Sequence, residues 1–288
     1  MKILVFGSTG LLGTYLTIFF KKKKKKVVET IGRSKKCNYR IPFDDIDEIS
    51  KSIKKSNPDV IINLIAMTDV DECESNHQES YKANVKIPQM IIKAIKSIKN
   101  YRPHIVHIST DQVYSGIGPH IENKTNPINI YSKTKLDGEK EFIGTRCSIL
   151  RTNFFGKTSI KNKLSFTDWL HEKLIKKERI TVFDDVFFNP LSMYSLCDVI
   201  NHVIDNEILG TYNVGSGGSI SKAKFAFEFA EAIGASSACA KVGNIADVKL
   251  NARRPNDMTM DCKKIENKIG KKLPDIIFEI HNVSKDYL

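Results

Sequence analysis

Short apolar segments alternate with longer segments of helical periodicity through the first half of the chain. The apolar segments are rich in β-branched residues, as expected for strands that helices cover on both faces, and comprise residues 3–6, 27–31, 60–64, 105–108 and 148–150. The segments between them predict helices over residues 11–20, 46–55, 80–99 and 129–142. This alternation is typical of β–α–β units, so we predict an α/β fold with a doubly wound parallel sheet.

The second half of the chain has a less regular pattern. After Arg151 it predicts one strand over residues 211–214 and one helix over residues 222–233. We therefore expect a sheet domain over residues 1–151, completed by parts of 185–240, and a smaller lobe mainly within 152–288, interleaved with the last sheet elements.

Composition narrows the class of protein. The 288 residues carry 45 Lys plus Arg and 33 Asp plus Glu, a net charge of +12, and half of this surplus comes from the lysines at 21–26. That run lacks interleaved aromatic residues and a binding motif, which argues against a nucleic-acid partner. Residues 3–20 are uncharged but are interrupted by glycines and threonines, so we expect no membrane segment. Six scattered cysteines without a Cys-x-x-Cys pair favour reduced thiols and a cytoplasmic protein.

A glycine-rich turn follows the first predicted strand and opens the first predicted helix. Gly7, Gly10 and Gly13 form a Gly-x-x-Gly-x-x-Gly pattern. Glycines at this place allow a sharp turn, a close approach of backbone N–H groups to a pyrophosphate, and close packing of helix on strand. The turn thus predicts a Rossmann-type dinucleotide site in the sheet domain. We expect the smaller lobe to bind the substrate.

The end of the second predicted strand bears on the choice of dinucleotide. A carboxylate there would bind the ribose hydroxyls of NAD, but this strand ends in Gly32, Arg33 and Ser34. A guanidinium beside a hydroxyl suits the 2′-phosphate of NADP, so we predict NADPH as the cofactor. Glu29 lies within the strand and keeps NADH open as an alternative.

Tyr131 and Lys135 stand four residues apart in a helical segment, so their side chains share one helix face. A neighbouring ammonium stabilises a phenolate, which suits a tyrosine that gives and takes protons. Thr110 follows the fourth predicted strand by two residues, at the edge where parallel sheets bind ligands. We interpret these three residues as a proton-transfer group.

At this point the sequence resembles the extended short-chain dehydrogenase/reductases, and within them the dTDP-4-dehydrorhamnose reductase group. The resemblance rests on the glycine turn, on 63–71, on Asn84, on 109–111, on 131–139, on 151–156 and on 254–257. It implies reduction of a 4-keto group on a nucleotide-linked 6-deoxysugar, in which NADPH delivers hydride to C4 and Tyr131 protonates the oxygen.

The resemblance also implies roles for further residues. Thr110 would hydrogen-bond the substrate oxygen, and Lys135 would hold the nicotinamide ribose. Residues expected to contact the cofactor are Gly7, Thr9, Gly10, Leu11, Leu12, Gly13, Arg33, Ser34, Asp44, Ala66, Tyr131 and Lys135, with Asp44 at the adenine amine. Residues expected to contact the substrate are Thr110, Asp111, Asn153 and Arg254, with Arg254 at the nucleotide diphosphate.

Related activities stay open at the level of sequence. Gln112 follows Thr110 and Asp111, at the position where similar sugar-nucleotide dehydratases have the glutamate of a Thr-Asp-Glu sequence. An amide takes no proton at neutral pH, so Gln112 disfavours dehydration. An NAD-dependent nucleotide-sugar 4-epimerase remains an alternative. So does a non-catalytic dinucleotide-binding subunit, since the regulatory beta subunit of methionine adenosyltransferase resembles the same group.

The remaining expectations concern residues without a motif. The seven histidines show no metal-ligand spacing, so we expect no metal site. Trp169 lies in an apolar helical pattern that predicts a core position. We further expect a homodimer with a nucleotide-sugar substrate.

Overall fold

The computed structural model describes residues 1–23, 26–42, 45–160 and 163–288. The described chain divides into two compact units. The first comprises Met1–Thr110, Asn129–Arg151 and Cys197–Thr211, and the second comprises Asp111–Ile128, Thr152–Leu196 and Tyr212–Leu288. The chain therefore passes between the units five times, after residues 110, 128, 151, 196 and 211.

The first unit is built on a parallel sheet. Among the described residues, seven strands pair in the order β11-β6-β5-β4-β1-β2-β3, and the pairings β1–β2, β1–β4, β2–β3 and β4–β5 are parallel. The strands are β1 (Lys2–Phe6), β2 (Val27–Gly32), β3 (Tyr39–Arg40), β4 (Val60–Asn63), β5 (His104–Thr110), β6 (Cys147–Thr152) and β11 (Gly210–Val214). This confirms the predicted α/β class and doubly wound sheet.

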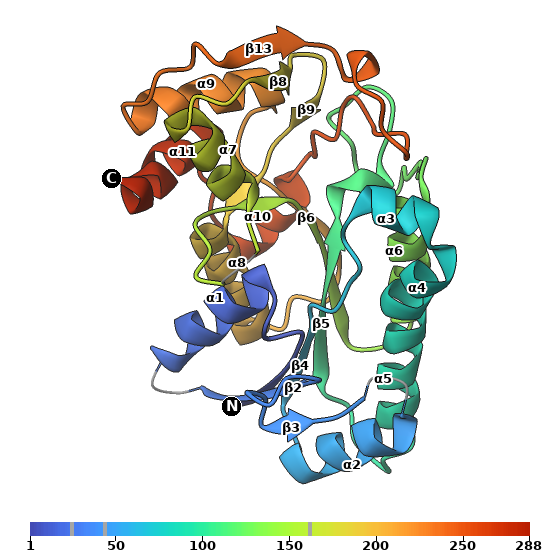
Figure 1. Cartoon of the computed structure of the whole chain (residues 1–288). Helices are drawn as coiled ribbons and strands as arrows, with labels where there is room; N and C mark the ends of the chain where they lie inside the picture. Colours follow the sequence, from blue (N-terminus) through green and yellow to red (C-terminus); the bar gives the residue numbers. More distant parts are fainter. Residues whose placement is uncertain (24–25, 43–44, 161–162) are drawn as a thin grey trace. The chain divides into compact units, whose positions relative to one another are not determined.

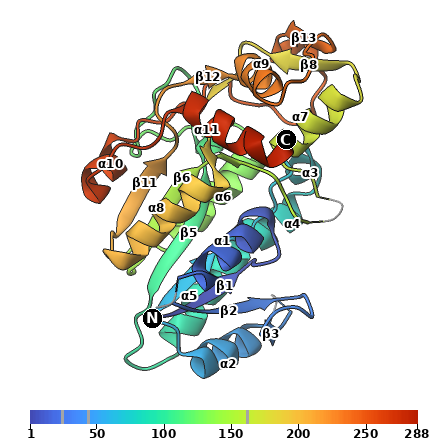
Figure 2. The same ribbon diagram turned by 90° about the vertical axis from the view of Figure 1, so that its left-hand side faces the viewer.

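Helices flank this sheet on both faces (Figures 1 and 2), as the continuously buried strands require. They are α1 (Leu11–Lys21), α2 (Ile46–Ser56), α3 (Val70–Ser75), α4 (His77–Tyr81), α5 (Ile87–Lys96), α6 (Ile130–Lys140) and the later part of α8 (Met193–Asp205). Helices α2, α5 and α6 lie on one face and α1 and α8 on the other, where Lys26 pairs with Asp205 at 2.6 Å. The core beneath α2 and α5 is mainly aliphatic and includes Leu4, Ile31, Ile49, Ile91 and Ile105.

The helix predicted over residues 80–99 is interrupted. A π-helical turn, η1 (Lys82–Lys86), lies between α4 and α5. Asn84 within it is 1% exposed, and its side chain binds both the amide and the carbonyl of Met67. The widened turn places this amide side chain where it can bind the loop after β4, a use typical of π-bulges near functional sites.

The second unit consists of short elements around its own core. Its strands are β7 (Phe154–Phe155), β8 (Ile180–Phe183), β9 (Phe187–Phe188), β10 (Leu191–Ser192), β12 (Ile220–Ser221) and β13 (Ala240–Gly243), and its helices are α7 (Phe166–Ile175), α9 (Lys222–Ala232), α10 (Lys263–Ile269) and α11 (Ile276–Ser284). Single turns η2 (Asp111–Val113), η3 (Ile245–Asp247) and η4 (Lys285–Tyr287) complete it. This core combines aliphatic side chains with the buried rings of Phe155, Phe188, Phe225 and Phe229.

Candidate active site

The turn between β1 and α1 has the geometry that its glycines predict. Gly7 has φ of +83°, and the amide of Gly10 donates to its carbonyl at 3.0 Å. A Cβ on Gly13 would lie 2.2 Å from the carbonyl oxygen of Gly7, so only glycine fits there. No acidic residue occupies the first turn of α1. The helix N-terminus therefore suits a phosphate, and the cradle fits a dinucleotide.

A pocket of about 530 Å³ in the first unit brings together two of the residues expected at the cofactor. Arg33 and Ala66 line it together with Met67 and Pro42. Ser34 follows Arg33 in the turn after β2, where its hydroxyl accepts a hydrogen bond from the amide of Lys36. The position of Asp44 lies outside the described residues. Thr9, Leu11 and Leu12 lie in the glycine turn and the first turn of α1.

Glu29, the residue that kept NADH open as an alternative, is already bound by neighbouring side chains. It lies in β2, where its carboxylate accepts a hydrogen bond of 3.0 Å from the Tyr39 hydroxyl, and the Lys2 ammonium is 3.9 Å away. Arg33, by contrast, is exposed at the pocket wall.

Helix α6 carries the Tyr131 and Lys135 pair. Asn129 caps this helix in a capping box with Ser132, which fixes the start of the helix at Ile130, directly before Tyr131. Tyr131 is 7% and Lys135 is 2% exposed. The Lys135 ammonium donates a hydrogen bond of 2.8 Å to the carbonyl of Ile108, two residues before Thr110 in β5. The structure therefore brings this helix face to the strand that ends in Thr110.

The buried position of Lys135 affects its charge. Desolvation lowers the pKa of Lys135 to about 8, while Glu139 one helical turn later opposes the decrease. His107 on β5 is fully buried, and desolvation together with Lys135 lowers its pKa well below the usual value. The imidazole of His107 is therefore neutral beside the ammonium.

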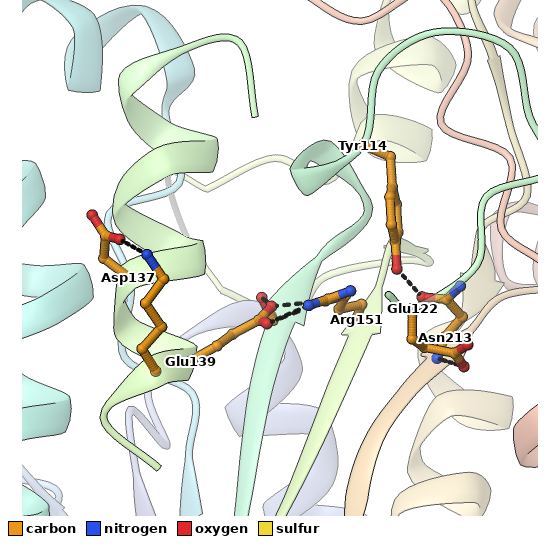
Figure 3. Close-up of polar contacts among 8 residues, drawn as sticks. Tyr114, Glu122, Asp137, Glu139, Arg151 and Asn213 are labelled. Carbon is orange, nitrogen blue, oxygen red and sulfur yellow. Dashed lines mark hydrogen bonds and ion pairs between the residues drawn. The ribbon is translucent and has the colours of Figure 1, made fainter. Parts of the chain in front are cut away.

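A buried ion pair lies beneath this group. Arg151 on β6 binds both carboxylate oxygens of Glu139, with a closest contact of 2.7 Å, and the two side chains are 6% and 4% exposed (Figure 3). The hydroxyl of Ser109, which precedes Thr110, donates to the same carboxylate. Glu139 thus connects α6, β5 and β6, a role that sequence reasoning did not identify.

Helix α6 is also held from its other side. Thr134, between Tyr131 and Lys135, accepts a hydrogen bond of 3.0 Å from the amide side chain of Asn84. A Cβ on Gly138 would lie 2.0 Å from the carbonyl oxygen of Asn84, so α6 approaches η1 as closely as glycine permits. Asn84 therefore connects the Ala66–Met67 loop with the helix that carries the pair.

The second unit has its own pocket, of about 280 Å³. Two of the residues expected at the substrate, Asn153 and Arg254, line it together with Gln112. Asn153 donates to Asp111, which is 2% exposed, at 2.8 Å.

The segment that holds Asp111 is anchored within this unit. The hydroxyl of Tyr114 donates a hydrogen bond of 2.6 Å to the side chain of Asn213, whose backbone amide binds Glu122 (Figure 3).

Sequence reasoning missed several residues of this pocket. Lys222 lines it from the first turn of α9, and the rings of Phe166 and Trp169 stack 6.2 Å apart at its wall. Trp169 packs against the core as expected, but it also faces the pocket. A lysine placed directly after the Ser221 helix cap was the signal available in the sequence.

Comparison with known proteins identifies the family to which the chain belongs. Its sequence matches the RmlD substrate-binding domain family over residues 1–288. The chain belongs to this family. The resemblance to extended short-chain dehydrogenase/reductases close to the dTDP-4-dehydrorhamnose reductase group is therefore confirmed.

Individual RmlD-family relatives span nearly the whole chain. A dTDP-4-dehydrorhamnose reductase of Escherichia coli is 28% identical and covers 96% of this chain and 94% of its own. The methionine adenosyltransferase 2 subunit beta of Mus musculus is 25% identical over 95% of this chain and 84% of its own. The crystal structure of a dTDP-4-dehydrorhamnose reductase from Bacillus anthracis in complex with NADP has a TM-score of 0.87 at 21% identity and covers 99% of both chains, which confirms the Rossmann-type fold.

Two further features bear on membrane and metal binding. No helix in the described ranges is long and apolar enough to cross a membrane. No group of three or more His, Cys, Asp or Glu side chains among the described residues could hold a metal ion.

Proposed function

We propose that this RmlD-family protein is an NADPH-dependent reductase of a nucleotide-linked 4-keto-6-deoxysugar. The observation that carries the proposal is the buried Tyr131 and Lys135 pair on a capped helix that packs against the strand ending in Thr110. The dTDP-4-dehydrorhamnose reductases among the relatives support the same substrate class.

The cofactor would bind at the glycine turn and the pocket that contains Arg33 and Ala66. NADPH would supply the hydride for the carbonyl carbon. Arg33, exposed at the pocket wall, is the cation for the 2′-phosphate, and the NADP complex of the Bacillus anthracis relative supports this choice.

Side chains of the protein would supply the proton that the carbonyl oxygen takes up. Tyr131 holds the proton at its hydroxyl and donates it to the carbonyl oxygen, while Thr110 donates a hydrogen bond to that oxygen. Lys135 stabilises the phenolate that remains and holds the ribose of the cofactor. Glu139 and Arg151 fix the helix from which both side chains project.

The test is NADPH consumption with dTDP-4-dehydrorhamnose and a panel of other keto-sugar nucleotides, followed at the nicotinamide absorbance band. We expect Tyr131→Phe to lower kcat by about 10²–10⁴-fold, the usual contribution of a general acid. Tyr194→Phe is the matched control, because Tyr194 is 62% exposed and lies on α8. Full turnover by Tyr131→Phe would refute the assigned proton donor.

A second function is favoured by the similarity to methionine adenosyltransferase 2 subunit beta over 95% of the chain. A non-catalytic subunit would bind the dinucleotide, consume no NADPH with any keto-sugar nucleotide, and co-purify with a larger partner. Steady NADPH consumption excludes this function. The homodimer and the cytoplasmic location expected from the sequence stay predictions, which sedimentation velocity and cell fractionation can check.

A further inference from the structure

Two cations line the pocket of the second unit. Arg254 was expected there from the sequence, but Lys222 was not. The Lys222 ammonium lies 4.6 Å from the centre of the Phe166 ring and 4.5 Å from that of Phe188. These cation–π contacts hold the ammonium against the aromatic side of the pocket.

This position is electrostatically unfavourable without a further anion. Lys222 is the first residue of α9, and a helix N-terminus carries a partial positive charge that favours anions. No acidic residue lies in the first turn of α9 to compensate. Desolvation lowers the pKa of Lys222, and Arg254 adds to the decrease while Asp111 opposes it. Asp111 also accepts the hydrogen bond from Asn153.

We propose that Lys222 binds the diphosphate of the nucleotide-linked substrate together with Arg254, as the second cation of this pocket. The inference rests on the proposed function, whose substrate class it makes more specific. A nucleoside diphosphate sugar carries two negative charges on adjacent phosphates. The guanidinium of Arg254 can bind phosphate oxygens in pairs, and the ammonium of Lys222 supplies a point charge.

The remaining walls of the pocket suit the nucleoside. Phe166 and Trp169 present stacked rings, and Val182, Val186 and Met258 add apolar surface. Aromatic and apolar walls with a few charged groups are typical of pockets that bind amphipathic small molecules. A nucleoside diphosphate combines both kinds of surface in one ligand.

A purely structural role for Lys222 makes a different prediction. If the side chain served only to pack on Phe166 and Phe188, an apolar chain of similar length would replace it without loss of binding. Lys222→Met makes this replacement, because it keeps the stem and removes the charge. Lys222→Arg keeps the charge. Lys224→Met is the matched control, since Lys224 is exposed on the same helix two residues later.

The experiment measures binding to the full chain without NADPH, so its result does not depend on turnover. Titration calorimetry gives the Kd of dTDP, saturation-transfer NMR follows thymidine, and a thermal melt confirms that each variant is folded. We expect Lys222→Met to weaken dTDP binding about 10–100-fold, the contribution of a charge-assisted hydrogen bond. Lys222→Arg should retain most of the affinity, Lys224→Met should match the wild type, and thymidine binding should stay unchanged in all three.

Two outcomes would overturn the inference. One is wild-type affinity of Lys222→Met for dTDP, and the other is an equal loss of thymidine and dTDP binding, which would indicate a collapsed pocket. Failure of the proposed function has a separate signature, because a protein without reductase activity could still lose dTDP binding on Lys222→Met. Conversely, turnover by the wild type with an unchanged KM in Lys222→Met would refute the role of Lys222 alone.

Discussion

Replacing Glu139 with glutamine removes the negative charge that lies beneath the Tyr131 and Lys135 pair. The side chains of Glu139 and Arg151 are 4% and 6% exposed and are 2.7 Å apart at their closest atoms. Removing one partner of such a buried pair leaves the other charge uncompensated, which costs about 3–5 kcal/mol. We therefore expect the free energy of unfolding of Glu139→Gln to fall by about this amount.

The same substitution should change the pH dependence of catalysis. Glu139 raises the pKa of Lys135, which desolvation lowers to about 8. Without the carboxylate the pKa of Lys135 falls further, so the ammonium loses its proton at a lower pH. Because the proposed reaction needs the charged form, the high-pH limb of kcat should move toward neutral pH. The other group facing Lys135, His107, is neutral and should contribute no compensating charge.

The assay combines urea unfolding with a pH profile of NADPH oxidation. The matched control is Asp137→Asn on the same helix, where an exposed carboxylate pairs with Lys140 at 2.7 Å (Figure 3). The control should change stability by less than about 0.5 kcal/mol, as exposed pairs do, and should leave the pH profile unchanged. A Glu139→Gln variant as stable as this control, or a high-pH limb that does not move, would refute the reasoning.

Three further predictions follow from single sites. Gly13→Ala places a Cβ 2.2 Å from the carbonyl of Gly7, so we expect a stability loss of about 1–3 kcal/mol by urea unfolding and about tenfold weaker NADPH binding by fluorescence titration. Arg33→Ala should lower the ratio of kcat/KM for NADPH over NADH about tenfold, and an unchanged ratio would remove Arg33 from the 2′-phosphate site. Burial lowers the pKa of His104 from 6.5 to about 4, so the unfolded chain binds more protons in this range. The contribution of neutral His104 to the free energy of unfolding is fully present above pH 6.5. It decreases by about 3 kcal/mol as the pH falls to about 4. His104→Asn should flatten this dependence in acid unfolding curves, whereas the exposed His281→Asn should not.

The sheet of the first unit could be predicted because its strands are buried on both faces. A strand such as β1, in which the residues from Ile3 to Phe6 are buried, appears in the sequence as a continuous apolar segment. Helix α6 was predicted over residues 129–142 and is observed over Ile130–Lys140, where Asn129 provides the N-cap. The glycine turn was predictable for a different reason, because a steric limit at Gly13 leaves no other residue type.

The break in the predicted helix over 80–99 has no comparable signal. The π-helical turn η1 forms because Asn84 binds the backbone of Met67, seventeen residues earlier, and the side chain of Thr134, fifty residues later. Neither contact follows from local periodicity. The same holds for Glu139, whose partner Arg151 comes from β6 and whose spacing to Lys135 resembles an ordinary surface pair of a helix.

The second unit was the hardest to predict, because its pocket is assembled from short segments far apart in sequence. Two-residue strands such as β7 and β12 carry too few positions for a period of two to be visible. Lys222 was missed for the same reason. Its charge interacts with Arg254 and Asp111, which come from segments distant in the sequence. A cation at a helix N-terminus is nevertheless a local conflict that can be read from the sequence once the helix start is known. Local conflicts of this kind tend to mark functional positions, so the Lys222 experiment also tests whether they can locate substrate contacts within this family.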